Sequence, residues 1–271
     1  MILLVGPLIA VLMLSFTDYS LGNDTLGFVG LQNYAEMLGD EVFRKAIVNT
    51  VLYVAIVVPG STLLGLGAAL LIEHVGAGKS LWRAVYFLPV MSTLIAMAIV
   101  WEFMLNARFG LLSQLLQVLG LPAKNWLQEP ATALPVLCAI GIWQTLGFNM
   151  VLFLAGLSSV PRDLYEALEL DGGRRAWDRF QTVTWPLLSP VTMFVVVITA
   201  IRSFQVFDTV HVLTKGGPNN ASMVLVYEMY QEGFEFFRSA YASALTVIFL
   251  LFVFALTFVK ARLIEKRVHY Q

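Results

Sequence analysis

The sequence predicts an all-α, polytopic membrane protein with six transmembrane helices. The mean hydropathy is +0.77 and 58% of the 271 residues are hydrophobic, values that lie outside the range of ordinary soluble domains. Apolar runs of about 20 residues, the length that crosses a bilayer, also recur along the whole chain. We therefore expect one transmembrane domain over residues 1–271, embedded in membrane lipid.

The apolar runs set the bounds of the predicted spans, which are 1–17, 47–72, 82–105, 132–157, 187–207 and 239–260. The first run is short, but it lacks the basic flank and the small-residue cleavage site of a signal peptide. We expect it to be retained as a span, with room for a short cytoplasmic tail ahead of the printed sequence.

The distribution of lysine and arginine predicts the orientation. If the N-terminus is cytoplasmic, ten of the 17 basic residues fall in inner segments, which agrees with the positive-inside rule. Both termini and the connection 161–186 are then cytoplasmic. The net charge of −1 offers no basic field for nucleic acid, so we expect no nucleic-acid partner.

The connection between the fourth and fifth spans differs from its surroundings. Residues 161–190 include nine charged residues, whereas charged residues make up only 13% of the chain. Pro161 suits the first turn of a helix, and Gly172 suits its left-handed end. The apolar face of this helix is formed by Leu164, Ala167 and Leu168. A second short helix is expected over 176–183, before the next span.

An amphipathic helix of this length is not stable alone, so its apolar face must pack against something. It can lie on the membrane surface, pack against its own bundle, or dock in a groove of another protein. The residues alone leave these alternatives open.

The same connection resembles the "EAA" loop of permease subunits in binding-protein-dependent ABC importers. The resemblance rests on Tyr165-Glu166-Ala167-Leu168, Asp171-Gly172, Phe180, Val183-Thr184-Trp185-Pro186 and Pro190. Leu168, Val183 and Trp185 depart from the family's usual Ala, Ile and Leu. An ordered series of further motifs is similar to the carbohydrate-permease branch: FVGLQNY (28–34), NTVLY (49–53), FLP (87–89), SFQVFDTVHVLTKGGPNNAS (203–222) and YASAL (241–245).

The resemblance implies the type I ABC importer permease fold and a permease of the bacterial cytoplasmic (inner) membrane, not an enzyme, that carries a sugar, a polyol or a glycerol phosphate. It implies a second, homologous permease subunit, an extracytoplasmic substrate-binding protein, and two ATPase subunits that bind ATP and Mg, with no cofactor in this chain. The helix of the 161–186 loop would lie in a cleft of an ATPase subunit and act as a lever. The residues implied in this coupling are Tyr165, Glu166, Ala167, Leu168, Asp171 and Gly172.

By the same resemblance, the substrate path is lined by Trp143, Gly147, Thr199 and Ser203. Polar side chains within spans usually face the interior of the bundle. Thr199 and Ser203 lie four residues apart, and helix–helix hydrogen bonding explains their hydroxyls equally well. Both interpretations stay open.

Other chemistries find little support in the sequence. The GAGKS stretch (76–80) has Glu73 where a phosphate-binding loop requires glycine. Three histidines in separate segments show no metal-ligand spacing: His74, His211 and His269. The alternative function is a self-sufficient secondary transporter or channel, which would need carboxylates deep in its spans for ion coupling. The deep portions of these apolar runs lack them.

Overall fold

The computed structural model describes the chain apart from residues 1, 23–25, 76–77, 121–123, 174 and 268–271. The described residues form helices, and their one β contact is an isolated antiparallel bridge between Thr17 and Phe28. The predicted all-α class is therefore confirmed.

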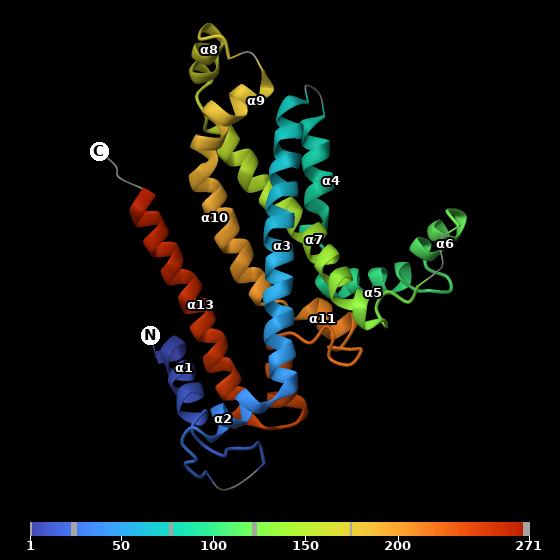
Figure 1. The fold of residues 1–271 in the computed structure, drawn as a ribbon, viewed down its shortest axis with the longest axis vertical. Helices are drawn as coiled ribbons and strands as arrows, with labels where there is room; N and C mark the ends of the chain where they lie inside the picture. The colour runs from blue at the N-terminus through green and yellow to red at the C-terminus, as the bar shows by residue number, and fades with distance from the viewer. Residues whose placement is uncertain (1, 23–25, 76–77, 121–123, 174, 268–271) are drawn as a thin grey trace. The chain divides into compact units, whose positions relative to one another are not determined.

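Figure 1 shows the order of the helices along the chain. They are α1 (Ile2–Leu14), α2 (Gln32–Gly39), α3 (Glu41–His74), α4 (Lys79–Met91), α5 (Leu94–Met104), α6 (Leu111–Val118), α7 (Pro130–Ser158), α8 (Arg162–Leu170), α9 (Ala176–Arg179), η1 (Phe180–Thr184), α10 (Trp185–Phe204), α11 (Asp208–Leu213), α12 (Leu225–Tyr230), η2 (Gln231–Glu235) and α13 (Ser239–Arg267). The segments η1 and η2 are π-helical.

Each predicted span has a helical counterpart, although the bounds differ. Within the described residues, three stretches are long and apolar enough to cross a membrane, Glu41–His74, Pro130–Ser158 and Ala176–Leu213, and the bent pair of α4 and α5 makes a fourth if it is taken as one span. Two apolar helices near the chain ends are shorter: Val5–Leu14 and Ser239–Ala255.

The predicted span 82–105 is not one continuous helix, because α4 ends at Met91 and α5 begins at Leu94. Pro89 lacks an N–H and so removes one hydrogen bond from the last turns of α4. The Ser92 hydroxyl donates to the Leu88 carbonyl at 3.1 Å, which gives that carbonyl a partner where the helix stops. The predicted span therefore corresponds to a pair of helices with a sharp bend between them.

The predicted gap between a short helix at 176–183 and the fifth span is also absent. The segments α9, η1 and α10 follow one another without a break. Pro186 takes one N–H out of the helical ladder, and the preceding residues adopt the wider i→i+5 pattern instead of ending the helix. In this pattern the Trp185 N–H donates to the Phe180 carbonyl.

The chain forms two compact units. The first comprises Met1–Val54, Leu94–Leu137 and Phe204–Gln271, and the second comprises Ala55–Thr93 and Cys138–Ser203. In the first unit α13 packs along α1, α2 and α12. The buried side chains at its centre are Met37, Phe43, Leu225, Tyr241, Ala244 and Leu245.

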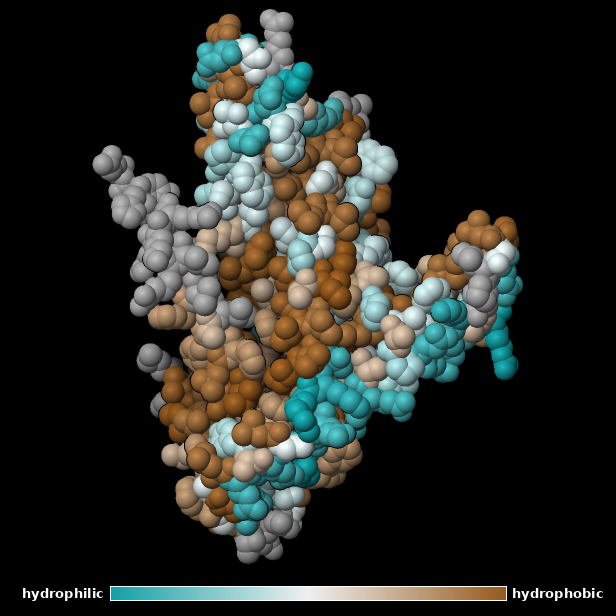
Figure 2. Space-filling view, in the orientation of Figure 1, coloured by the Kyte–Doolittle hydropathy of each residue, from teal (hydrophilic) through white to brown (hydrophobic). Residues whose placement is uncertain are grey.

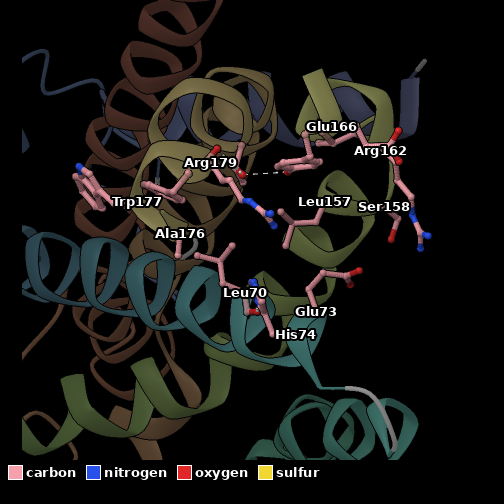
Figure 3. Close-up of a pocket in the computed structure, with 14 residues that line it drawn as sticks. Leu70, Glu73, His74, Leu157, Ser158, Arg162, Glu166, Ala176, Trp177 and Arg179 are labelled. Carbon is pink, nitrogen blue, oxygen red and sulfur yellow. Dashed lines mark hydrogen bonds between the residues drawn. The ribbon is translucent and has the colours of Figure 1, made fainter. Parts of the chain in front are cut away.

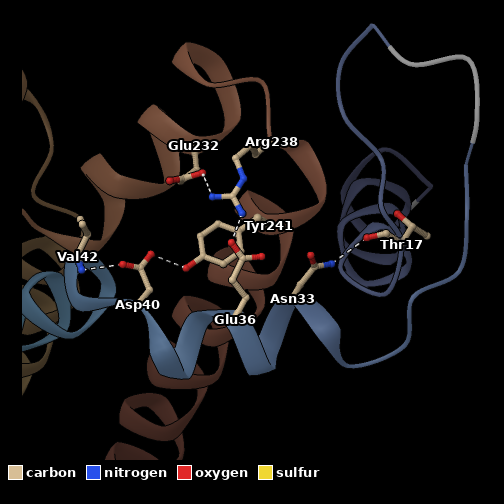
Figure 4. A network of polar contacts seen from close by, with 8 residues as sticks. All are labelled: Thr17, Asn33, Glu36, Asp40, Val42, Glu232, Arg238 and Tyr241. Atoms are coloured by element: carbon tan, nitrogen blue, oxygen red, sulfur yellow. Dashed lines mark hydrogen bonds and ion pairs between the residues drawn. The ribbon is translucent and has the colours of Figure 1, made fainter.

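Polar contacts reinforce the first unit (Figure 4). The Tyr241 hydroxyl donates to Asp40 at 2.8 Å, and Arg238 forms ion pairs with Glu36 and Glu232. The Asn33 amide donates to two carbonyls at the end of α1. Asn33 belongs to the motif FVGLQNY and Tyr241 to YASAL, so each of these motifs supplies one contact that holds α2 or α13 in place.

The NTVLY motif has a similar role. The Asn49 amide donates to the carbonyls of Asn220 and Met223, at 3.1 and 2.9 Å. The Thr50 hydroxyl accepts a hydrogen bond from the Leu225 N–H at 2.9 Å. These contacts fasten the loop before α12 to the first turns of α3, and they join two stretches that the sequence had shown only as separate motifs.

The second unit is built on a core shared by α3, α7 and α10. Its buried side chains are Leu66, Ala68, Ala69, Ile72, Met150, Phe153, Leu154, Leu188 and Val195. On the face seen in Figure 2, hydrophobic side chains cover much of α3, whereas hydrophilic side chains gather over α8 and α9. This contrast agrees with a membrane-embedded bundle that carries a polar loop.

Candidate functional site

The candidate coupling loop begins at α8. Pro161 occupies the N-cap with φ −62° and ψ 134°, so the helix starts at Arg162, one residue later than predicted. The carboxylate of Asp163 lies in the first turn, where it complements the positive end of the helix dipole.

The end of α8 is a Schellman motif. Gly172 has φ +92°, which is the left-handed conformation that the sequence predicted for it. The Gly173 N–H donates to the Leu168 carbonyl at 2.9 Å, and the Gly172 N–H donates to the Glu169 carbonyl at 3.2 Å. A Cβ atom at Gly173 would lie 2.7 Å from Leu168 Cδ1, so both glycines are needed for this turn.

The apolar face of α8 is mostly exposed within the described chain, and only Leu168 of its three residues is half-buried. None of the residues of α8 is buried, and Leu164 and Leu170 are 43% and 91% exposed. Glu166 and Ala167 are exposed as well. Packing against its own bundle, one of the alternatives left open by the sequence, therefore accounts for only part of this face.

A groove of about 1070 Å³ lies beside α8 (Figure 3). It separates α8 from the ends of α3 and α7. Its charged lining residues are Glu73, Arg162, Glu166 and Arg179, His74 adds an imidazole, and Trp177 and Phe180 add aromatic surface. The groove thus offers both signs of charge next to apolar side chains.

Two side-chain contacts join α8 to the segment that follows the loop. The Tyr165 and Thr184 hydroxyl oxygens are 3.0 Å apart, and Arg179 pairs with Glu169. The resemblance implied a different role for Tyr165, as a contact of the ATPase, and implied no role for Thr184.

The predicted substrate-path residue Thr199 is fully buried and forms part of a polar chain across three helices. Its hydroxyl donates to Asn149 Oδ1 at 3.0 Å, and Asn149 Nδ2 donates to the Ser61 hydroxyl at 3.2 Å. Ser61 in turn donates to the Val57 carbonyl at 2.6 Å. This arrangement is the helix–helix bonding that the sequence left open for Thr199, and Ser61 was missed because a lone serine in an apolar run carries no distinguishing signal.

The other predicted substrate-path residues lie in different surroundings. Gly147 is buried, and a Cβ atom there would lie 2.0 Å from the Tyr86 carbonyl oxygen, so this glycine permits close packing of α4 on α7. Trp143 is 36% exposed, and Ser203 is buried. Their contact with a substrate stays a prediction.

Over the described ranges, no group of three or more His, Cys, Asp or Glu side chains is arranged to hold a metal ion. Cys138 is buried within α7.

Comparison with known proteins gives the family. Residues 61–270 match the model of the "binding-protein-dependent transport system inner membrane component" family. The chain is 34% identical over 250 residues to the sn-glycerol-3-phosphate transport system permease protein UgpA of Agrobacterium fabrum, covering 90% of this chain and 83% of that protein. It is 36% identical over 209 residues to the trehalose/maltose transport system permease protein MalF of Thermococcus litoralis, covering 76% of this chain and 70% of that one.

A solved structure supports the fold. A chain of a bacterial alginate ABC transporter, solved in complex with an alginate pentasaccharide-bound periplasmic protein, superposes with a TM-score of 0.87 at 21% identity. The superposition covers 99% of this chain and 90% of that chain. With the matched family model and the two relatives, it follows that this polytopic chain belongs to the family of inner membrane components of binding-protein-dependent transport systems.

Proposed function

We propose that this chain is a permease subunit of an ABC importer for a sugar, a polyol or a glycerol phosphate. Family membership supports the transport role and argues against a self-sufficient secondary transporter or channel. The substrates in the names of the two relatives, trehalose or maltose and sn-glycerol-3-phosphate, support the substrate class. The distribution of basic residues supports cytoplasmic termini in a bacterial cytoplasmic membrane.

The observation that carries the coupling role is the exposed face of α8. An amphipathic helix with no buried residue and a sharp glycine end is suited to a groove on a partner. Glu166 takes part in no ion pair with the described residues, so its carboxylate is available to a basic group of that partner. The partner in this proposal is one of two ATPase subunits, which bind ATP and Mg, and α8 conveys their movement.

The remaining partners follow from the family. They are a second, homologous permease subunit and an extracytoplasmic substrate-binding protein. Trp143, Gly147, Thr199 and Ser203 remain the proposed substrate path. In this proposal, Thr199 shapes the path through its hydrogen bond to Asn149. Gly147 shapes it by allowing α4 and α7 to pack closely.

The test compares three variants in the assembled transporter. Glu166→Lys places a charge of the wrong sign in the docking face, and Gly172→Val forces a β-branched residue into a left-handed conformation at a cost of about 1–2 kcal/mol or more. Glu129→Lys makes the same charge change just before α7 and serves as the control. We expect the first two variants to lose ATPase co-purification or substrate-stimulated ATP hydrolysis, while the control keeps both. Normal values in both α8 variants would remove the coupling role from this loop.

A further inference from the structure

The N-terminal end of α10 and the preceding segment η1 pack into the core of the second unit. In η1, Val183 and Thr184 are buried, and the Phe180 ring packs against the core cluster shared by α3, α7 and α10. The Phe180 ring also lies between those of Trp177 and Trp185, in tilted contacts with ring centroids 5.7 and 5.9 Å away. Since η1 continues directly into α10, the buried Thr184 is held in place at the start of that helix.

The side chain of Tyr165 on α8 contacts Thr184. The Thr184 hydroxyl lies 3.2 Å from the Arg179 carbonyl, and a carbonyl can only accept. The single hydroxyl hydrogen of Thr184 is thus used there. At the 3.0 Å contact between the two side chains, the Tyr165 hydroxyl is therefore the donor and Thr184 Oγ1 the acceptor.

A second contact runs parallel to the first. Arg179 pairs with Glu169 one turn further along α8, but both side chains are more than two-fifths exposed. A surface ion pair of this kind contributes little, because water and salt screen it. The contact between the half-buried Tyr165 and the buried Thr184 is less exposed than this ion pair.

The opposite side of α8 lacks such contacts. Between the end of α7 and α8 the chain passes through Ser159 and Val160, which are not helical. Across the described residues no hydrogen bond or ion pair joins α8 to α3 or α7, and the 1070 Å³ groove lies between them. The side-chain connections of α8 among the described residues therefore run to α9, through Arg179, and to η1, through Thr184, and η1 continues directly into α10.

We propose that Tyr165 is a positioning residue. Its hydrogen bond to Thr184 holds α8, the coupling helix, at the start of α10, so that a displacement of α8 is transmitted to the bundle through α10. This inference rests on the proposed function of α8, and it assigns to Tyr165 an internal contact in place of a contact with the ATPase. It requires α8, η1 and α10 to move together.

The first experiment measures this rigidity directly. In a Cys138→Ala background, which removes the single native cysteine, Asp163→Cys on α8 and Leu187→Cys on α10 carry nitroxide labels for distance measurement in the complete transporter. We expect one narrow distance distribution that is the same with and without ATP, and a broader one after Tyr165→Phe. A distance that changes with ATP in the otherwise unaltered protein would overturn the proposal.

The second experiment measures coupling. Tyr165→Phe, Thr184→Val and the double variant remove the contact, whereas Thr192→Val removes a hydroxyl bonded to Leu188 within α10 itself. We expect ATPase co-purification to be retained and the ATP hydrolysed per substrate transported to rise at least twofold, equally in the three variants and not in the control. An unchanged ratio in all three would refute the positioning role. Normal ATPase co-purification and substrate-stimulated ATP hydrolysis in both Glu166→Lys and Gly172→Val would refute the docking role of α8 separately.

Discussion

Thr199 on α10 donates a hydrogen bond to Asn149 on α7, with 3.0 Å between Oγ1 and Oδ1. Because Asn149 also donates to Ser61 on α3, one buried amide links the three helices of the second unit. Polar contacts between helices in an apolar environment fix which faces meet, since each group would otherwise be buried without a partner. The chain therefore specifies the packing of this unit through a polar contact as well as through its apolar core.

Replacing Thr199 with Val should destabilise the folded permease by about 0.6–2 kcal/mol, the range found for hydrogen bonds between membrane helices. The shape of the side chain is kept, but Asn149 Oδ1 loses its donor. Thermal unfolding of the purified transporter measures the effect, with Thr199→Ser expected to stay near the original stability. Thr192→Val is the control, because its hydroxyl bonds only to its own helix. Lower transport with unchanged thermal stability would instead favour direct contact between Thr199 and the substrate.

Gly147→Ala should prevent α4 from packing on α7. The new Cβ atom would lie 2.0 Å from the Tyr86 carbonyl oxygen, and backbone atoms cannot move aside as a flexible side chain can. We expect a loss of about 3 kcal/mol or more and a low yield of folded permease, measured by fluorescence-detected size exclusion. Gly67→Ala in α3 is the matched control, because nothing lies within 4 Å of its Cβ position. That control should be neutral or stabilising by about 0.5–1 kcal/mol, and equal behaviour of the two variants would contradict the packing argument.

Local signals in the sequence were sufficient for the helical class, the positions of the spans and the end of α8. Gly172 illustrates why: a glycine directly after an amphipathic run ends a helix for reasons that lie within a few residues. The same holds for α8 itself, whose apolar face is visible from residue spacing alone.

Features that depend on distant residues, or on how a helix accommodates a proline, could not be predicted in this way. The break at Ser92 and the π-helical turn of η1 depend on how a proline is accommodated by the helix around it. The role of Gly147 depends on the backbone of α4, some sixty positions earlier in the chain. Ser61 and Thr184 look ordinary in the sequence and gain their roles only from the side chains that reach them.

Glu228 on α12 is another residue that the sequence did not single out. It is 2% exposed, and neither of its carboxylate oxygens has a hydrogen-bond partner among the described residues. Burial raises the pKa of this carboxyl from 4.5 to about 8, and the neighbouring carboxylates of Asp40 and Glu232 add to the shift. At pH 7 the folded protein therefore keeps Glu228 mainly protonated.

Glu228→Gln should remove a pH-dependent loss of stability in the first unit. The pKa of Glu228 is higher in the folded state than in the unfolded state, so its stabilising contribution is complete below about pH 4.5 and is lost as pH rises to about 8. A shift of this size corresponds to a few kcal/mol. Thermal unfolding between pH 5 and pH 9, values chosen roughly to bracket that window, should therefore show the Gln variant increasingly more stable than the original protein as pH rises. The exposed Glu235→Gln variant is the control and should follow the original protein. Parallel pH profiles for the original protein and Glu228→Gln would mean that the carboxyl is already ionised in the folded state, with a partner that the described residues do not supply.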